Sequence, residues 1–73
     1  MYVIHLRKGQ YVLSAKGETP THMIHDLKDK LIKTMPATDG ILLEDLERHL
    51  KSYGPLTLAV LAGWRIIHHA VDD

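Results

Sequence analysis

The sequence predicts a small α+β domain in which an N-terminal β-hairpin is followed by three helices, the last two in a helix-turn-helix-like arrangement. Apolar residues alternate along residues 1–15, as in a strand with one buried face, and from residue 19 onward they recur every three to four positions, as in amphipathic helices. A chain of 73 residues forms one domain with a small core. We therefore expect a single domain over 1–73, with the hairpin at 1–15 and the helical part at 19–73.

The hairpin is predicted from the segment YVIHLRKGQYVLSA, with Lys8-Gly9 as its two-residue loop. This register pairs Leu6 with Tyr11, Ile4 with Leu13 and Tyr2 with Ala15 on one apolar face. An isolated hairpin is only marginally stable in water, so the helices should cover that face. The opposite face is a candidate contact surface, whose exposed strand edge could also accept a partner strand. Its residues are Val3, His5, Arg7 and Val12.

The first helix is predicted to begin at Thr19-Pro20, because threonine is a favourable N-cap and proline is favourable at the first helical position. Its apolar residues fall within one stripe, and we expect Pro36 to end it. The stripe consists of Met23, Ile24, Leu27, Leu31 and Met35.

The second helix is predicted within ILLEDLERHLKSYG, and the third is predicted to begin at Pro55, directly after Gly54 as a helix C-cap. The stripe of the second helix contains Leu42, Leu43, Leu46, Leu50 and Tyr53. We expect the third helix to continue to the end of the chain. Its inward face would be Leu56, Val60, Gly63, Trp64, Ile67, Ala70 and Val71.

The last two helices have the rhythm of a helix-turn-helix, which resembles the small winged-helix and repressor-type folds. A helix that reads base edges needs polar or basic side chains on its exposed face, and this one offers few. We therefore favour a helix-turn-helix used as a scaffold, with a DNA-binding regulator as the alternative.

Leu58 and Leu61 lie outside the inward face of that third helix and allow two interpretations. They are core residues if the hairpin covers them, or part of a contact patch if it does not. In the second case the patch consists of Leu58, Leu61, Arg65 and His69.

The composition limits the classes of function. Nine basic residues balance nine acidic ones, so the broad positive field of a nucleic-acid binder is missing, although residues 1–36 carry a net +3 and residues 37–73 a net −3. A surface of both signs suits a protein partner. The absence of cysteine favours a reducing compartment, and no apolar run is long enough to span a membrane. We expect a cytoplasmic protein.

The number of histidines, six in 73 residues, is unusually high. His22, His25 and Asp29 share a helix face at a spacing that could approach zinc, but no fourth ligand is evident and surface histidines at this spacing are usually incidental. No nucleophile elbow and no phosphate-binding glycine loop is present. We therefore expect no enzyme, no metal and no cofactor.

The compact length, the hairpin MYVIHLRKGQYVLSA and the helix-turn-helix rhythm without a basic reading helix resemble the small phage-encoded regulators of host RNA polymerase. The resemblance implies a protein that binds RNA polymerase and inhibits initiation by interfering with the σ factor, in the host cytoplasm and without chemistry of its own. The alternatives are the DNA-binding regulator and a self-associating structural module.

Overall fold

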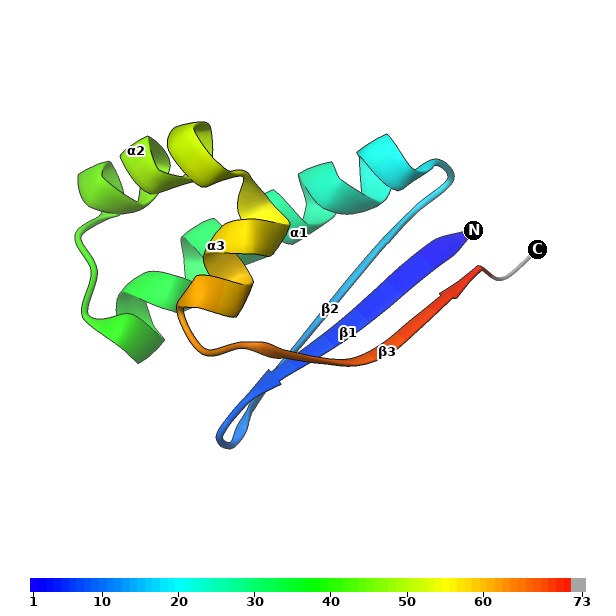
Figure 1. The fold of residues 1–73 in the computed structure, drawn as a ribbon, viewed down its shortest axis with the longest axis horizontal. Coiled ribbons are helices and arrows are strands. Elements are labelled where there is room, and N and C mark those ends of the chain that lie inside the picture. The colour runs from blue at the N-terminus through cyan, green and yellow to red at the C-terminus, as the bar shows by residue number, and fades with distance from the viewer. Residues whose placement is uncertain (72–73) are drawn as a thin grey trace.

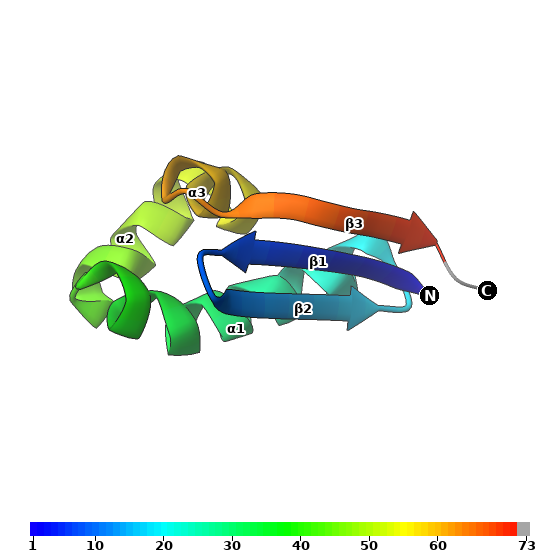
Figure 2. The same cartoon turned by 90° about the horizontal axis from the view of Figure 1, so that it is seen from below.

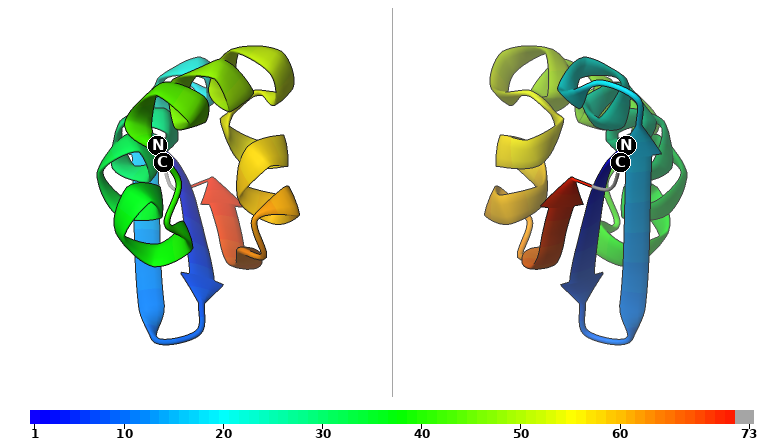
Figure 3. Two further views of the ribbon diagram at one scale, coloured as in Figure 1. Left: turned by 90° about the vertical axis from the view of Figure 1, so that its left-hand side faces the viewer. Right: turned by 90° about the vertical axis from the view of Figure 1, so that its right-hand side faces the viewer.

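A computed structural model describes residues 1–71 and has the predicted α+β class, with an N-terminal antiparallel hairpin and three helices. The elements follow in the order β1 (Tyr2–Lys8), β2 (Tyr11–Gly17), α1 (Pro20–Asp39), α2 (Leu43–Tyr53), α3 (Pro55–Leu61) and β3 (Arg65–Val71). The strands form one sheet in the order β2-β1-β3. The helices lie together on one side of this sheet, as Figures 1 and 3 show.

The hairpin has the predicted faces but not the predicted register. Leu6 pairs with Leu13 and Lys8 with Tyr11, so every pair is shifted by two positions and the loop is Gly9-Gln10 rather than Lys8-Gly9. Gly9 has φ +59° and occupies the first loop position, where glycine is favoured in type II′ turns. A shift of two keeps each side chain on its face, because side chains alternate with a period of two.

Helix α1 begins as predicted and ends later than predicted. The Thr19 side chain accepts a hydrogen bond from the His22 amide at 3.1 Å, and Pro20 is the first helical residue. Pro36 does not end the helix, which continues to Asp39 and stops at Gly40, a left-handed residue with φ +66°. The added turn is held because Met35 is fully buried and Asp39 pairs with Lys8 of the hairpin.

The prediction of a long third helix is wrong. Helix α3 ends at Leu61 in a Schellman motif: the Gly63 amide donates to the Val60 carbonyl at 3.1 Å, and the Trp64 amide donates to the Ala59 carbonyl at 2.9 Å. Gly63 has φ +97°, which stops the helix. A single residue, Gly54, joins α2 to α3, and the structure does not confirm a helix-turn-helix arrangement.

The segment Arg65–Val71 is instead strand β3, which pairs antiparallel with β1. Its β-branched residues Ile66 and Ile67 favour a strand. The pairing opposes His68 to His5 and Ile66 to Leu6, so Ile67 is the extra residue of a bulge. The first strand of the chain is therefore the central strand of the sheet.

The core lies between the helices and the inner face of the sheet. Trp64 belongs to it and anchors the connection from α3 to β3. Val60, predicted to face inward, is exposed, and so are Leu42, Leu43 and Tyr53 at the ends of the second predicted stripe. The buried residues are Ile4, Leu6, Leu13, Ala15, Met23, Leu27, Leu31, Met35, Leu46, Leu50, Leu58, Ala59 and Trp64.

Candidate protein-binding surface

The sheet has one face that no helix covers, seen toward the viewer in Figure 2. Helix α1 packs on β1 and β2 from the other side, and α3 contacts the beginning of β3. We call this surface the uncovered face. The strand pairing assigns to it Val3, His5 and Arg7 of β1, Val12, Ser14 and Lys16 of β2, and Arg65, His68 and Ala70 of β3.

The four contact residues predicted on the hairpin all lie on the uncovered face, and Arg65 joins them. Arg65 was predicted on the last helix but lies in β3, directly opposite Arg7. The two contact surfaces predicted separately, on the hairpin and on the last helix, thus each contribute one arginine to the uncovered face.

The other predicted contact patch does not exist as one surface. Leu58 is 5% exposed and belongs to the core, whereas Leu61 is 66% exposed on α3. His69 pairs with Ile4 and so lies on the opposite side of the sheet from Arg65. The patch was wrong because it assumed a helix through residues that form a strand. Leu61 stays accessible on α3, beside a shallow hollow of about 310 Å³ that His49 and Tyr53 also line, while Arg65 and His69 are exposed on opposite faces of the sheet.

Histidines gather at the centre of the uncovered face. His5 Nδ1 lies 2.5 Å from Ser14 Oγ on β2, and its ring centroid lies 5.5 Å from that of His68 on β3. Sequence reasoning missed Ser14 and His68, because their proximity to His5 depends on the register and on the third strand. Within residues 1–71, no carboxylate contacts this group, so His5 lacks the orienting acid of a catalytic triad.

The charged residues of the sheet are all basic, whereas the helices carry both signs. The three strands contain Arg7, Lys8, Lys16 and Arg65 and no acidic residue. Three acidic residues of the helices form ion pairs: Asp45 binds Arg48, Asp26 binds the Lys30 ammonium at 3.1 Å, and Asp39 binds Lys8 of β1. The Lys16 backbone amide donates to Asp26 Oδ2 at 2.9 Å, and this hydrogen bond holds the pKa of that carboxyl below its usual value. The uncovered face is left basic.

The turn end of the sheet is hollowed where β1, the hairpin loop and the beginning of β3 meet. This hollow has a volume of about 480 Å³. Arg7 Nε donates to the Gly9 carbonyl at 2.9 Å, which holds the guanidinium over the loop. The lining residues are Arg7, Gly9, Gly63, Arg65, Ile66 and Ile67.

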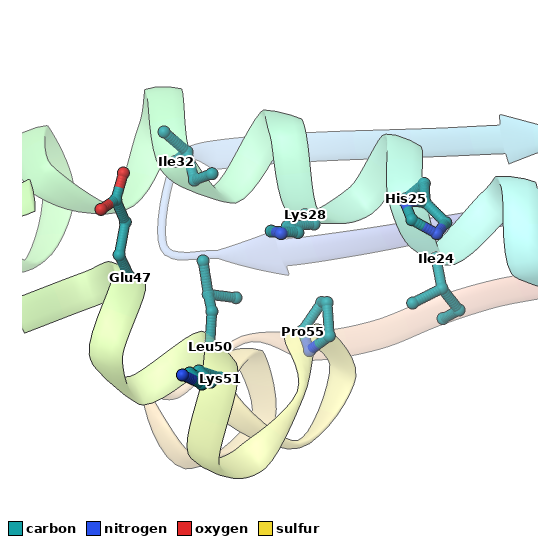
Figure 4. A pocket seen from close by; sticks show the side chains of 8 residues that line it. All are labelled: Ile24, His25, Lys28, Ile32, Glu47, Leu50, Lys51 and Pro55. Carbon is teal, nitrogen blue, oxygen red and sulfur yellow. The ribbon is translucent and has the colours of Figure 1, made fainter.

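A separate groove of about 520 Å³ lies between α1 and the junction of α2 with α3 (Figure 4). Its apolar lining is Ile24, Ile32, Leu50 and Pro55, and its polar lining is His25, Lys28, Glu47 and Lys51. Ile24 was predicted in the buried stripe of α1 but is only half-buried, because the neighbouring helices leave this groove open beside it.

The outer strands of the sheet, β2 and β3, each have one edge that pairs with no other strand of the described chain. Such edges can pair with a strand of another chain. Within residues 1–71, β2 and β3 pair only with β1. Side chains of α1 occupy part of the outer edge of β2, because the Lys16 amide donates to Asp26 and the Ser14 carbonyl accepts from Lys30. The edge of β3 is therefore the more open one, and the bulge at Ile67 interrupts its row of amide and carbonyl groups.

The described part of the chain, residues 1–71, has no cluster of three or more histidine or acidic residues suited to a metal ion. In the same range, no helix is long and apolar enough to cross a bilayer. Comparison of the chain with protein-family models, with curated proteins and with solved structures finds no match.

Proposed function

We propose that this protein is a non-enzymatic regulator that acts by binding another protein through the uncovered face of its sheet. The observation that carries the proposal is the open sheet itself: within residues 1–71, one face has no helix on it, and the outer strand β3 has an edge that pairs with no other strand. Open antiparallel sheets with free edges are surfaces that proteins use to bind extended segments of a partner.

The chemistry of the uncovered face supports a protein rather than a small molecule as the partner. Val3 and Val12 supply apolar contact area, Arg7 and Arg65 supply charge, and His5 and Ser14 supply hydrogen-bonding groups. Interfaces between proteins combine these properties, with arginine enriched among the residues that contribute most to binding.

Bacterial RNA polymerase is the partner we propose, with inhibition of initiation as the outcome. This choice rests on the resemblance of the chain to the small phage-encoded regulators of host RNA polymerase. The same choice agrees with a sequence that lacks a catalytic motif and the net charge of a DNA binder.

The alternative is a DNA-binding regulator, now by a different surface. Helix α3 has seven residues and carries no basic side chain, which removes its role as a reading helix. The basic uncovered face could still contact phosphates. Since binding through several phosphate contacts weakens steeply with salt, raising the salt concentration separates the two functions.

The test uses the immobilised full chain and purified bacterial RNA polymerase, with and without σ factor, together with promoter-directed transcription. Val12→Glu places a charge on the uncovered face, and Val60→Glu makes the same change at a similarly exposed site on α3. We expect the first variant to lose polymerase binding and inhibition, and the second to keep both. No binding by the unmodified protein, or binding that only DNA supports and salt abolishes, would contradict the proposal.

A further inference from the structure

Arg7 and Arg65 form an unusual pair, since two cations face each other directly across adjacent strands. Like charges at directly opposed positions destabilise a sheet. No ion pair neutralises either guanidinium within residues 1–71: the ion pairs found there join Lys8 to Asp39, Lys30 to Asp26 and Arg48 to Asp45. The pair therefore lacks a counter-ion at the place where the sheet is hollowed.

The fixed geometry of this pair suits an incoming anion. Side chains at opposed positions start about 5 Å apart at their Cβ atoms, so both guanidinium groups can reach one carboxylate or phosphate. The hydrogen bond from Arg7 Nε to the Gly9 carbonyl uses one donor and leaves the terminal nitrogens for a ligand. Gly9 and Gly63 line the hollow without side chains and leave room above the arginines.

The other walls of the hollow are apolar and favour a peptide over a nucleic acid. Ile67, the bulged residue, is 56% exposed and lines the same hollow as the arginines. Ile66 also borders the hollow, but it pairs with the buried Leu6 and so faces the helix side of the sheet. A peptide in which acidic and aliphatic residues alternate can match both surfaces, whereas a phosphate backbone gains nothing from Ile67. Only Lys16 adds a further fixed positive charge to this face, fewer than a nucleic-acid surface usually offers.

We infer that Arg7 and Arg65 form a clamp for a carboxylate of an acidic, partly aliphatic segment of a partner protein, with Ile67 contacting the neighbouring aliphatic side chain. The inference rests on the proposed function in taking a protein as the partner, and it adds the chemistry of the segment that is bound. It predicts that aspartate or glutamate lies at the centre of the contact.

The test titrates the full chain with the peptide Val-Glu-Val-Glu-Val-Glu and with its counterpart in which glutamine replaces each glutamate. The nuclear magnetic resonance signals of the arginine Nε–H groups are followed. We expect the Arg7 and Arg65 signals to shift with the glutamate peptide and not with the glutamine peptide. Arg65→Gln should weaken binding about tenfold, the loss expected for one charge-assisted contact. Arg48→Gln removes an equal charge from α2 and should leave binding unchanged.

Equal shifts with both peptides, no shift with either, or tighter binding of a DNA duplex or of inorganic phosphate at these arginines would overturn the inference. Polymerase binding by the immobilised Arg65→Gln variant separates this result from the proposed function. If the variant retains polymerase as well as the unmodified protein and the peptide does not bind, the clamp is refuted and the proposed function stands. If the peptide binds but polymerase does not, the clamp stands and the choice of polymerase fails.

Discussion

Replacing Leu58 by alanine tests the packing of α3 most directly, because Leu61 on the same helix provides a matched control. Leu58 is 5% exposed and Leu61 is 66% exposed. Truncation of a buried leucine removes about three methylene-sized groups at about 0.8 kcal/mol each, and the remaining cavity adds to that loss. We expect Leu58→Ala to lower the free energy of unfolding by about 2.5–4 kcal/mol, and Leu61→Ala to change it by less than about 0.5 kcal/mol.

Urea unfolding followed by tryptophan fluorescence measures this difference. Trp64 is the single tryptophan of the chain and is 2% exposed, so its emission reports the loss of the core. With a slope of about 1 kcal/mol per molar urea for a small domain, the midpoint of Leu58→Ala should fall by about 2.5 M or more. A domain of this length has a total stability of about 4–11 kcal/mol, so the variant is expected to fold in the absence of urea if the total exceeds about 5 kcal/mol, and to lose its folded baseline at the lower end of the range. Equal midpoints for the two variants would refute the placement of α3.

Three further predictions follow from the fold. Gly17→Ala should destabilise the protein by more than about 2 kcal/mol, because the added Cβ would lie 2.3 Å from the Met23 backbone nitrogen. Gly9→Ala meets no atom within 4 Å and should cost only about 1 kcal/mol, for the positive φ of this residue. Thermal unfolding of both variants measures the difference. Asp26→Asn should cost about 0.5–1 kcal/mol near neutral pH, since the carboxylate is partly open to water. Because folding lowers the pKa of Asp26, the contribution of its carboxylate to the free energy of unfolding is complete above the unfolded pKa of 3.8 and is lost as the pH falls through the lower folded pKa. A stability difference between Asp26→Asn and the unmodified protein that persists well below pH 3.8 would contradict this role of the carboxylate. Amide hydrogen exchange in β3 should alternate between protected amides facing β1 and unprotected amides facing the free edge, and continuous protection from residue 64 to residue 70 would indicate a helix instead.

The faces of the hairpin could be predicted from the sequence, but its register could not. Alternation of apolar residues assigns Ile4, Leu6, Leu13 and Ala15 to one face in any register that shifts by an even number of positions. Both Lys8-Gly9 and Gly9-Gln10 give Gly9 a loop position. The choice between these two loops depends on how the hairpin packs against α1, and the hairpin sequence alone carries no information about that packing.

Strand β3 was missed because its apolar residues fit a helical wheel as well as a strand. Short apolar runs cannot be assigned by periodicity alone. Gly63 was the available indication: a glycine near the end of an apolar helix can be its C′ residue, and the β-branched pair Ile66-Ile67 that follows favours a strand. Placing Gly63 on the inward face of a continuous helix hid this boundary.

The candidate site could be predicted only in part, because strand β3 was not predicted. Val3, His5, Arg7 and Val12 followed from the alternation of the hairpin and lie on the uncovered face. The positions of Arg65 opposite Arg7 and of His68 beside His5 required the third strand. No pattern within residues 1–15 indicates which distant segment completes the sheet.

The position of β1 has a consequence for how the protein folds during synthesis. Tyr2 pairs with Val71, so the central strand β1 leaves the ribosome before the helices, and its neighbour β3 leaves it after them. Pairing of these strands closes a loop that contains almost the whole described chain, which is a slow kind of contact to form. Until β3 emerges, the nascent chain exposes an unpaired edge of β1. We therefore expect the sheet to be completed only after translation has passed β3, and the nascent hairpin to be the stage most prone to aggregation.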